Sequence, residues 1–325
     1  MKKIFKHFIL TGLILLILLF PVFAQQQTPI KVHQVKGNIY EVKGGSGANT
    51  GFFIGEKEVL VIDAKMSEES AKQMIAEIKK LTSNPIEHII LTHSDGDHVN
   101  GLIGFPEGIN IIAHHQTRKH MNEAFKEPKQ RLYLPTQTFS TKMKLYSGSK
   151  LIKLLYFGPA HTNGDIVVFF PEEKVAFLGD LIFLGRDLLI HRHKSGSSFG
   201  AVKTLKSILE LGADTFVHGH GDIASKSDIE GLVKSLEEKQ NKIKTLIQEG
   251  KTLDEIKKVF NVEDRTAQPG RRRWLSLVET IYLEITEKKL VESVLGGTNF
   301  NSTSISFALR KRQNLTSSFH VNPER

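Results

Sequence analysis

Alternating apolar and polar positions predict a series of strands and helices from residue 31 onward. Short apolar runs between glycine-rich turns predict strands at 31–36, 38–43, 50–54 and 59–62. A helix follows Ser67, because the apolar residues after it recur at helical spacing: Ala71, Met74, Ile75, Ile78 and Leu81. Further strands are predicted at 88–92, 109–113, 151–157, 165–170, 174–178 and 214–217. Several of these runs are apolar throughout, which is typical of strands covered on both faces, so we predict an α/β protein.

The pattern changes to helices alone after residue 225. Two capping boxes, Ser227 with Glu230 and Thr252 with Glu255, predict helix starts. Two apolar stripes are expected to join the core: Ile229, Leu232, Val233, Leu236, Ile243 and Ile247 form one, and Trp274, Val278, Ile281 and Ile285 form the other. We therefore interpret residues 225–290 as a helical region packed on the preceding domain. Residues 291–325 are rich in polar residues and have no clear period, which favours a loose tail.

The first 24 residues have the layout of a secretory signal. Lysines at positions 2, 3 and 6 precede an apolar run at 8–20, and Val22 and Ala24 occupy the −3 and −1 places of a cleavage site. That run has about 13 residues, which is short against the roughly 20 that a membrane span needs. We therefore expect export, either to the periplasm or out of the cell, with no stable membrane span once the signal is removed.

Composition limits the chemistry. The chain has 325 residues, of which 40% are hydrophobic and 24% charged, and this excludes a disordered or collagen-like protein. It has no cysteine, so thiol nucleophiles and cysteine-bound metals are excluded, and any metal must be held by nitrogen and oxygen ligands. The net charge of +9 is spread out rather than gathered in a basic stripe. We expect a small-molecule substrate rather than nucleic acid as partner, and the sequence predicts no oligomeric state.

Residues 91–101 carry the densest chemical signal. His93, Asp95, Asp97 and His98 place four potential metal ligands within six residues, directly after a predicted apolar strand. A loop that leaves the end of a rigid strand can hold such ligands closely, and four of them together indicate two metal ions. A polar turn with solvated side chains would explain a lone histidine, but it does not explain this density.

Three more potential ligands follow other apolar strands. His161 lies in the loop 158–165, Asp180 closes the run 175–178, and His220 stands between two glycines after the strand at 214–217. Those glycines permit a close approach of the backbone, which favours His220 over His218 as a ligand. The alternative for His218 is a buried, hydrogen-bonded residue.

These blocks resemble the metallo-β-lactamase-fold superfamily of metallohydrolases, at 59–63, 92–98, 158–165, 177–180 and 219–221. The resemblance implies a four-layer αβ/βα sandwich over residues 30–224, with the ligand loops at one edge. It implies two metal ions with these ligands: His93, Asp95 and His161 for the first, Asp97, His98 and His220 for the second, and Asp180 as the bridge. Asp97 and Asp180 would be the catalytic carboxylates, because a hydroxide shared by the two ions is oriented there.

Asp95 departs from the superfamily pattern, in which most members carry a histidine. A third carboxylate makes the site more neutral and favours harder metals, so iron or manganese is an alternative to zinc, our first choice. The other interpretation makes Asp95 a solvated loop residue beside one complete metal site.

Two segments are candidates for binding substrate. In the superfamily a hairpin at 44–49 borders the pocket, which makes Asn49 a candidate, although a plain hairpin turn is an equal alternative. His191 and Arg192 lie where relatives reach over the substrate, and their charge would suit a carboxylate or phosphate. The alternative is a solvated basic loop.

The sequence as a whole predicts an exported hydrolase that uses a hydroxide bound by two metals to cleave an ester, thioester, lactone, amide or phosphodiester bond. β-Lactamase activity is one alternative, but true β-lactamases of this fold usually carry cysteine or serine at the place of Asp180. A non-haem iron oxidoreductase of the same fold is another, although no flavin domain follows residue 225. A binding module without activity and a nuclease are the weakest alternatives.

Overall fold

The computed structural model describes residues 28–263 and 273–295. Within these ranges a first sheet has seven strands in chain order: β1 (Lys31–Lys36), β2 (Ile39–Lys43), β3 (Thr50–Ile54), β4 (Val59–Ile62), β5 (Ile86–Ile90), β6 (Asn110–His114) and β7 (Gln137–Phe139). Strands β1 to β4 are antiparallel neighbours, whereas β4 to β7 run parallel and are joined by helical connections. The parallel strands therefore end at the same edge of the sheet.

A second sheet faces the first. Its five strands lie in the order β12 (Thr215–Val217), β11 (Val175–Phe177), β10 (Val167–Phe170), β9 (Lys150–Leu155) and β8 (Lys142–Ser147). Strands β8 to β11 are antiparallel, and β12 joins β11 in parallel. Apolar side chains from both sheets, among them Ile62, Ile90, Phe170 and Val217, form a core between them.

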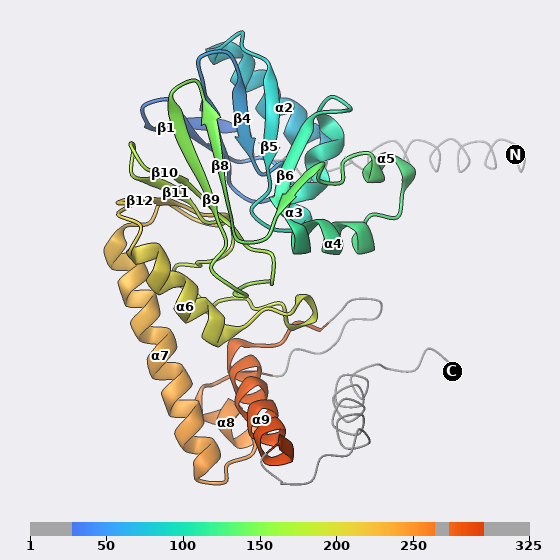
Figure 1. Ribbon diagram of the computed structural model, residues 1–325. Coiled ribbons are helices and arrows are strands. Elements are labelled where there is room, and N and C mark those ends of the chain that lie inside the picture. The colour runs from blue at the N-terminus through green and yellow to red at the C-terminus, as the bar shows by residue number, and fades with distance from the viewer. Residues whose placement is uncertain (1–27, 264–272, 296–325) are drawn as a thin grey trace, which may run out of the picture.

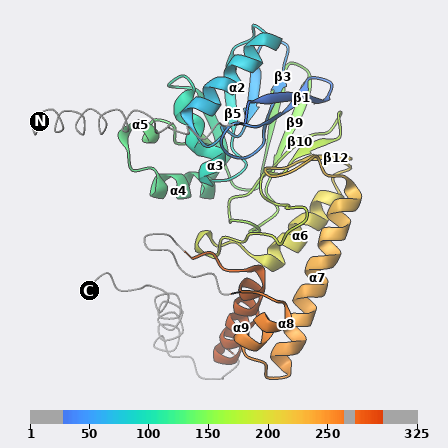
Figure 2. The same cartoon turned by 180° about the vertical axis from the view of Figure 1, so that it is seen from behind.

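Helices cover the outer faces of both sheets (Figure 1; Figure 2 shows the reverse side). On the side of the first sheet lie α2 (Glu68–Leu81), α3 (Gly96–Val99), the 3-10 turn η1 (Asn100–Gly104), α4 (His115–Ala124) and α5 (Pro128–Arg131). Between the last two strands of the second sheet come the 3-10 turn η2 (Arg192–Lys194) and α6 (Ser198–Leu209), and after β12 come α7 (Lys226–Gln248), α8 (Leu253–Val259) and α9 (Leu277–Leu295). Each helical layer closes an apolar cluster over its sheet. The predicted four-layer sandwich with C-terminal helices is confirmed.

The start of α7 corrects one predicted cap. The capping box joins Ser225 to Asp228, not Ser227 to Glu230, because the helix begins at Lys226. The second box, Thr252 with Glu255, is confirmed.

Trp274 does not belong to the apolar stripe in which we placed it. Helix α9 begins only at Leu277, and the Trp274 side chain is 41% exposed, whereas Val278 and Ile281 are fully buried. The indole instead packs beside the rings of His191 and His193, with centroid distances of 4.5 and 5.5 Å.

Several predictions concern other parts of the chain. The signal at 1–24 and residues 296–325 of the tail lie outside the described residues, and the domain limits stay predictions. Among the helices of the described part, none is long and apolar enough to cross a membrane.

Candidate metal centre

Four loops meet at one edge of the sandwich. They follow the strands β5, β9, β11 and β12. The loop after β5 carries His93 and Asp95 and leads into α3, which carries Asp97 and His98. The other three loops bring His161, Asp180 and His220 to the same place. The structure thus brings together all seven side chains that the sequence singled out as metal ligands.

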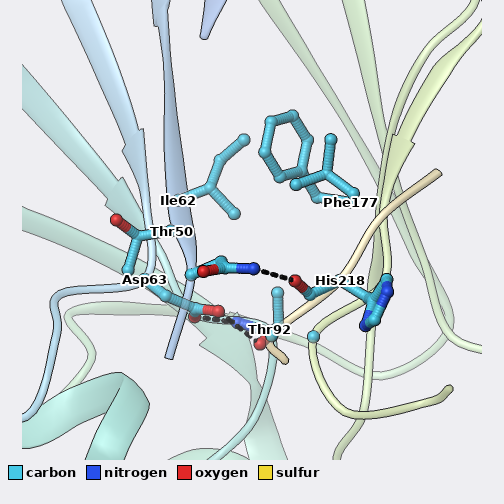
Figure 3. Close-up of a pocket in the computed structure, with 10 residues that line it drawn as sticks. Thr50, Ile62, Asp63, Thr92, Phe177 and His218 are labelled. Atoms are coloured by element: carbon cyan, nitrogen blue, oxygen red, sulfur yellow. Dashed lines mark hydrogen bonds between the residues drawn. The ribbon is translucent and has the colours of Figure 1, made fainter. Parts of the chain in front are cut away.

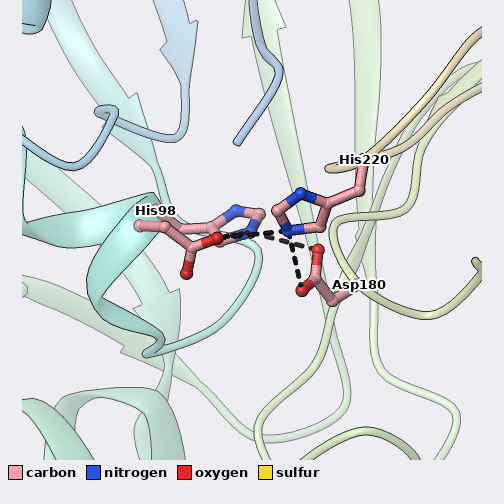
Figure 4. A group of neighbouring side chains, drawn as sticks. His98, Asp180 and His220 are labelled. Atoms are coloured by element: carbon pink, nitrogen blue, oxygen red, sulfur yellow. Dashed lines mark hydrogen bonds and ion pairs between the residues drawn. The ribbon is translucent and has the colours of Figure 1, made fainter. Parts of the chain in front are cut away.

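Four residues form one group at this edge: Asp97, His98, Asp180 and His220 (Figure 4). The Nε2 atom of His220 lies 3.1 Å from Asp97 Oδ2 and 3.3 Å from Asp180 Oδ2. The Nε2 atom of His98 lies 3.1 Å from Asp180 Oδ1. Ligands of one zinc ion at about 2.1 Å from the metal stand about 3 to 3.5 Å apart, so these distances suit a shared cation.

A second group lies beside the first and shares Asp180 with it. Its members His93, His161 and Asp180 offer ligand atoms within 4.8 Å of one another. Asp95 adjoins this group, since its Oδ2 atom lies 3.1 Å from His161 Nε2 and 3.8 Å from His93 Nε2. The position of Asp180 between both groups is the one expected of a bridging ligand.

Hydrogen bonds behind the site fix the orientation of three imidazoles. His98 Nδ1 donates to Asp63 Oδ2 over 2.8 Å, and His161 Nδ1 donates to the Leu189 carbonyl over 2.6 Å. The Thr92 hydroxyl donates to Asp63 Oδ2, so it accepts a hydrogen bond from His93 Nδ1. Each Nδ1 therefore keeps its proton, so that Nε2 is the nitrogen that can give up its proton and ligate a metal ion.

The carboxylates stay ionised although they are partly or fully buried. Burial would raise the pKa of Asp180, but His98 and His220 hold it well below its usual range. Burial likewise acts on Asp95, and hydrogen bonds from His161 and from His191 hold its pKa well below the usual range. Hydrogen bonds to Asp180 and Asp97 in turn raise the pKa of His220 to about 9. Ionised carboxylates that lie this close together, with little solvent, favour the binding of cations between them.

The residues present fit a pair of divalent cations. The Nε2 atom of His93 is buried and has no hydrogen-bond partner among the described residues, which a metal ion would supply. The donor set is imidazole and carboxylate only, as the absence of cysteine demands, and this set suits zinc and also iron.

Gly219 is what lets the His220 loop approach so closely. A Cβ atom at this position would lie 2.2 Å from Asp180 Oδ1 and 2.9 Å from His98 Cε1. Any side chain would therefore displace the carboxylate. The neighbouring His218 is 2% exposed and donates from Nε2 to the Asp222 carbonyl, as the alternative interpretation of this residue holds.

Asp63 is a site residue whose role we did not predict. It follows β4, has a positive φ of 61°, and accepts hydrogen bonds from His98 and from both the amide and the hydroxyl of Thr92. Its sequence signal was an aspartate at the end of an apolar strand, the same signal that marked Asp180. Because β4 pairs in parallel with β5, Asp63 lies beside the loop that carries the ligands.

The three residues proposed to bind substrate have other partners. The Asn49 side chain donates to the carbonyls of His218 and Gly221, which ties its loop to the His220 loop. Arg192 points to α9, where it pairs with Glu287 at 2.6 Å. His191 lies against Asp95, with 2.6 Å between Nε2 and Oδ2.

A small pocket lies behind the site, between the two sheets (Figure 3). It is lined by residues that include Thr50, Asp63, Thr92 and His218, and it has room for about one water molecule. It is therefore too small for an organic substrate.

Comparison with known proteins agrees with this picture. Residues 44–220 match the family model described as the Metallo-beta-lactamase superfamily. The Metallo-beta-lactamase type 2 of Elizabethkingia meningoseptica is 28% identical over 171 residues, which are 50% of this chain and 66% of that protein. The Hydroxyacylglutathione hydrolase GloC of Haemophilus influenzae is 30% identical over 139 residues, 40% of this chain and 64% of that protein. The chain thus spans slightly less than two thirds of either relative.

Among solved structures, a metallo-beta-lactamase from Pontibacter korlensis superposes with a TM-score of 0.56. The match covers 64% of this chain and 99% of that chain at 17% sequence identity. At this identity the match concerns the fold alone.

Proposed function

Since this chain belongs to the metallo-beta-lactamase superfamily of metallohydrolases, we propose that it is an exported hydrolase that depends on two metal ions and acts on a small molecule. One observation carries the proposal. Four imidazoles and three carboxylates from separate segments turn their ligand atoms toward one another at a single edge of the sandwich.

The proposed division of labour follows from the geometry. His93, Asp95 and His161 would hold a first zinc ion, Asp97, His98 and His220 a second, and Asp180 would lie between them. When bound, the two cations supply a water of lowered pKa and polarise the oxygen of the bond to be cleaved. Asp97, whose side chain is 27% exposed against 5% for Asp180, faces the open side and would orient the attacking water.

An ester, thioester, lactone, amide or phosphodiester bond would suit this chemistry. We place the thioester, lactone and phosphodiester first, because an aspartate stands at the position of Asp180, where true β-lactamases usually carry cysteine or serine. β-Lactam cleavage is the second candidate, favoured by the likeness to the Elizabethkingia enzyme. Export is supported by the leader at 1–24.

A substrate panel tests the proposal. Purified protein loaded with zinc is offered nitrocefin, a lactone, a thioester and a phosphodiester, and we expect turnover of at least one. A double variant, Asp97→Ala with His98→Ala, should lose the second metal ion and about 100- to 10,000-fold of that turnover. Full metal content in the double variant would contradict the proposal, as would iron in the native protein together with oxygen consumption.

A further inference from the structure

The loop before η2 brings a fifth imidazole to the metal centre. We propose that His191 is a ligand of the first metal ion and supplies the imidazole that Asp95 replaces in this chain. The inference rests on the proposed metal centre and adds to it a residue from outside the superfamily's ligand blocks.

Three histidines surround one oxygen of Asp95. The Oδ2 atom lies 2.6 Å from His191 Nε2, 3.1 Å from His161 Nε2 and 3.8 Å from His93 Nε2. Asp95, His161 and His191 offer ligand atoms that all lie within 4.8 Å of one another. Ligands of a single ion stand about 3 to 3.5 Å apart, so an ion here would replace the hydrogen bond between His191 and Asp95 and move their two ligand atoms slightly apart.

The backbone and the neighbouring rings hold His191 in this place. Its side chain is 2% exposed, its amide donates to the His161 carbonyl over 2.8 Å, and its carbonyl accepts from Lys194 and Gly196. Its ring packs against His161 and Trp274, with centroid distances of 4.3 and 4.5 Å. The imidazole is therefore positioned before any ion binds, which favours ligation because little conformational freedom remains to be lost.

Lys194 cancels the extra charge of Asp95. Its Nζ atom lies 2.6 Å from Asp95 Oδ1 and 3.0 Å from Ser94 Oγ, which leaves the other carboxylate oxygen toward the histidines. The charges of Asp95 and Lys194 cancel. With the neutral imidazole of His191 added, the three residues match the charge and the nitrogen ligand of a single histidine. The first site then keeps three imidazoles, His93, His161 and His191, a nitrogen-rich set that suits zinc.

The competing role for His191 is that of a hydrogen-bond donor that only orients Asp95. Glutamine separates the two roles, because its amide can donate to a carboxylate but is a poor zinc ligand. Asp95→His separates them a second way, since it restores a histidine at the position where most relatives carry one.

The experiment measures zinc and cobalt affinity by competition with a chromophoric chelator, and the cobalt absorption spectrum reports the ligand set. We expect His191→Ala and His191→Gln each to weaken one of the two sites at least tenfold, and Asp95→His to restore that site in the His191→Ala background. His193→Ala is the control, since its ring also packs near Trp274, at 5.5 Å, and it should leave both affinities unchanged. Thermal melting confirms that each variant is folded.

Full affinity in His191→Gln would overturn the inference in favour of an orienting hydrogen bond, and full affinity in both His191 variants would remove any role in metal binding. Either result leaves a two-metal wild type in place. A wild-type protein that binds no metal would overturn both this inference and the proposed function.

Discussion

A substitution of Asp63 tests how hydrogen bonds set the tautomers of the histidines at the metal centre. Its Oδ2 atom accepts hydrogen bonds from His98 Nδ1 over 2.8 Å and from the Thr92 hydroxyl over 2.7 Å. Through that hydroxyl it also determines the proton position on His93, whose Nδ1 lies 3.0 Å from Thr92 Oγ1. One carboxylate therefore fixes the tautomer of a ligand in each metal group.

Asp63→Asn reverses this arrangement without adding bulk. The amide nitrogen at the place of Oδ2 donates to His98 Nδ1, which moves the imidazole proton to Nε2, where a metal ion would bind. The backbone tolerates the change, because asparagine adopts a positive φ as readily as aspartate and φ is 61° here. Loss of such an outer partner weakens metal binding about 10- to 100-fold, or about 1.4 to 2.7 kcal/mol.

Isothermal titration with zinc, or competition with a chromophoric chelator, measures the effect. Asp222→Asn is the matched control, because it makes the same chemical change on a side chain that is 98% exposed near the His220 loop. We expect the control to bind zinc like the wild type. Equal affinity in both variants would refute the assignment of Asp63 as the residue that sets the tautomers.

Three further predictions concern stability. Removal of divalent cations with a chelator should lower the melting temperature and the free energy of unfolding, by about 2.7 kcal/mol relative to protein with free zinc at 100 times its Kd; an unchanged melt would contradict a bound metal. Burial lowers the pKa of His114 to about 4 in the folded protein. As the pH falls, the histidine is therefore protonated in the unfolded chain before it is protonated in the folded one, and the free energy of unfolding should fall by about 2 kcal/mol between pH 7.5 and 5. Urea unfolding of His114→Asn should lack this part of the pH dependence, and the same slope in both proteins would refute it. Phe170→Ala, between the sheets at 0% exposure, should cost about 3 to 5 kcal/mol, whereas Tyr146→Ala, at 64% exposure, should change unfolding by less than about 0.5 kcal/mol; similar costs would contradict the core as described.

The sequence predicted the ligands well because each of them follows an apolar strand or sits in a dense motif. His161, Asp180 and His220 occupy loops at strand ends of one sheet, and His93 follows a strand of the sheet that faces it, so all four reach the same edge of the sandwich. Of the paired strands β8 and β9, only β9 was predicted. Strand β8 alternates exposed and half-buried residues at the edge of its sheet and lacks a continuous apolar run. Helix α6 carried a readable signal, the cap Ser197 followed by apolar residues at helical spacing, which we did not use.

The sequence did not predict the directions of side chains in irregular segments. Arg192 and His191 are neighbours in the chain, yet one pairs with α9 and the other reaches Asp95, because the 3-10 turn η2 and the contacts with Trp274 set their orientation. Nothing in the local pattern separates these two outcomes. The role of Asp63 likewise depends on the parallel pairing of β4 with β5, a long-range contact.

The proposed function requires two cations among the seven side chains at the edge of the sandwich. Anomalous diffraction from a crystal of protein grown with zinc tests it directly. We expect two peaks about 3.5 to 4 Å apart, each within bonding distance of histidine Nε2 atoms and both beside Asp180. A map with no peak there, or with metal only at the surface group of Glu58, Glu87 and His88, would contradict it.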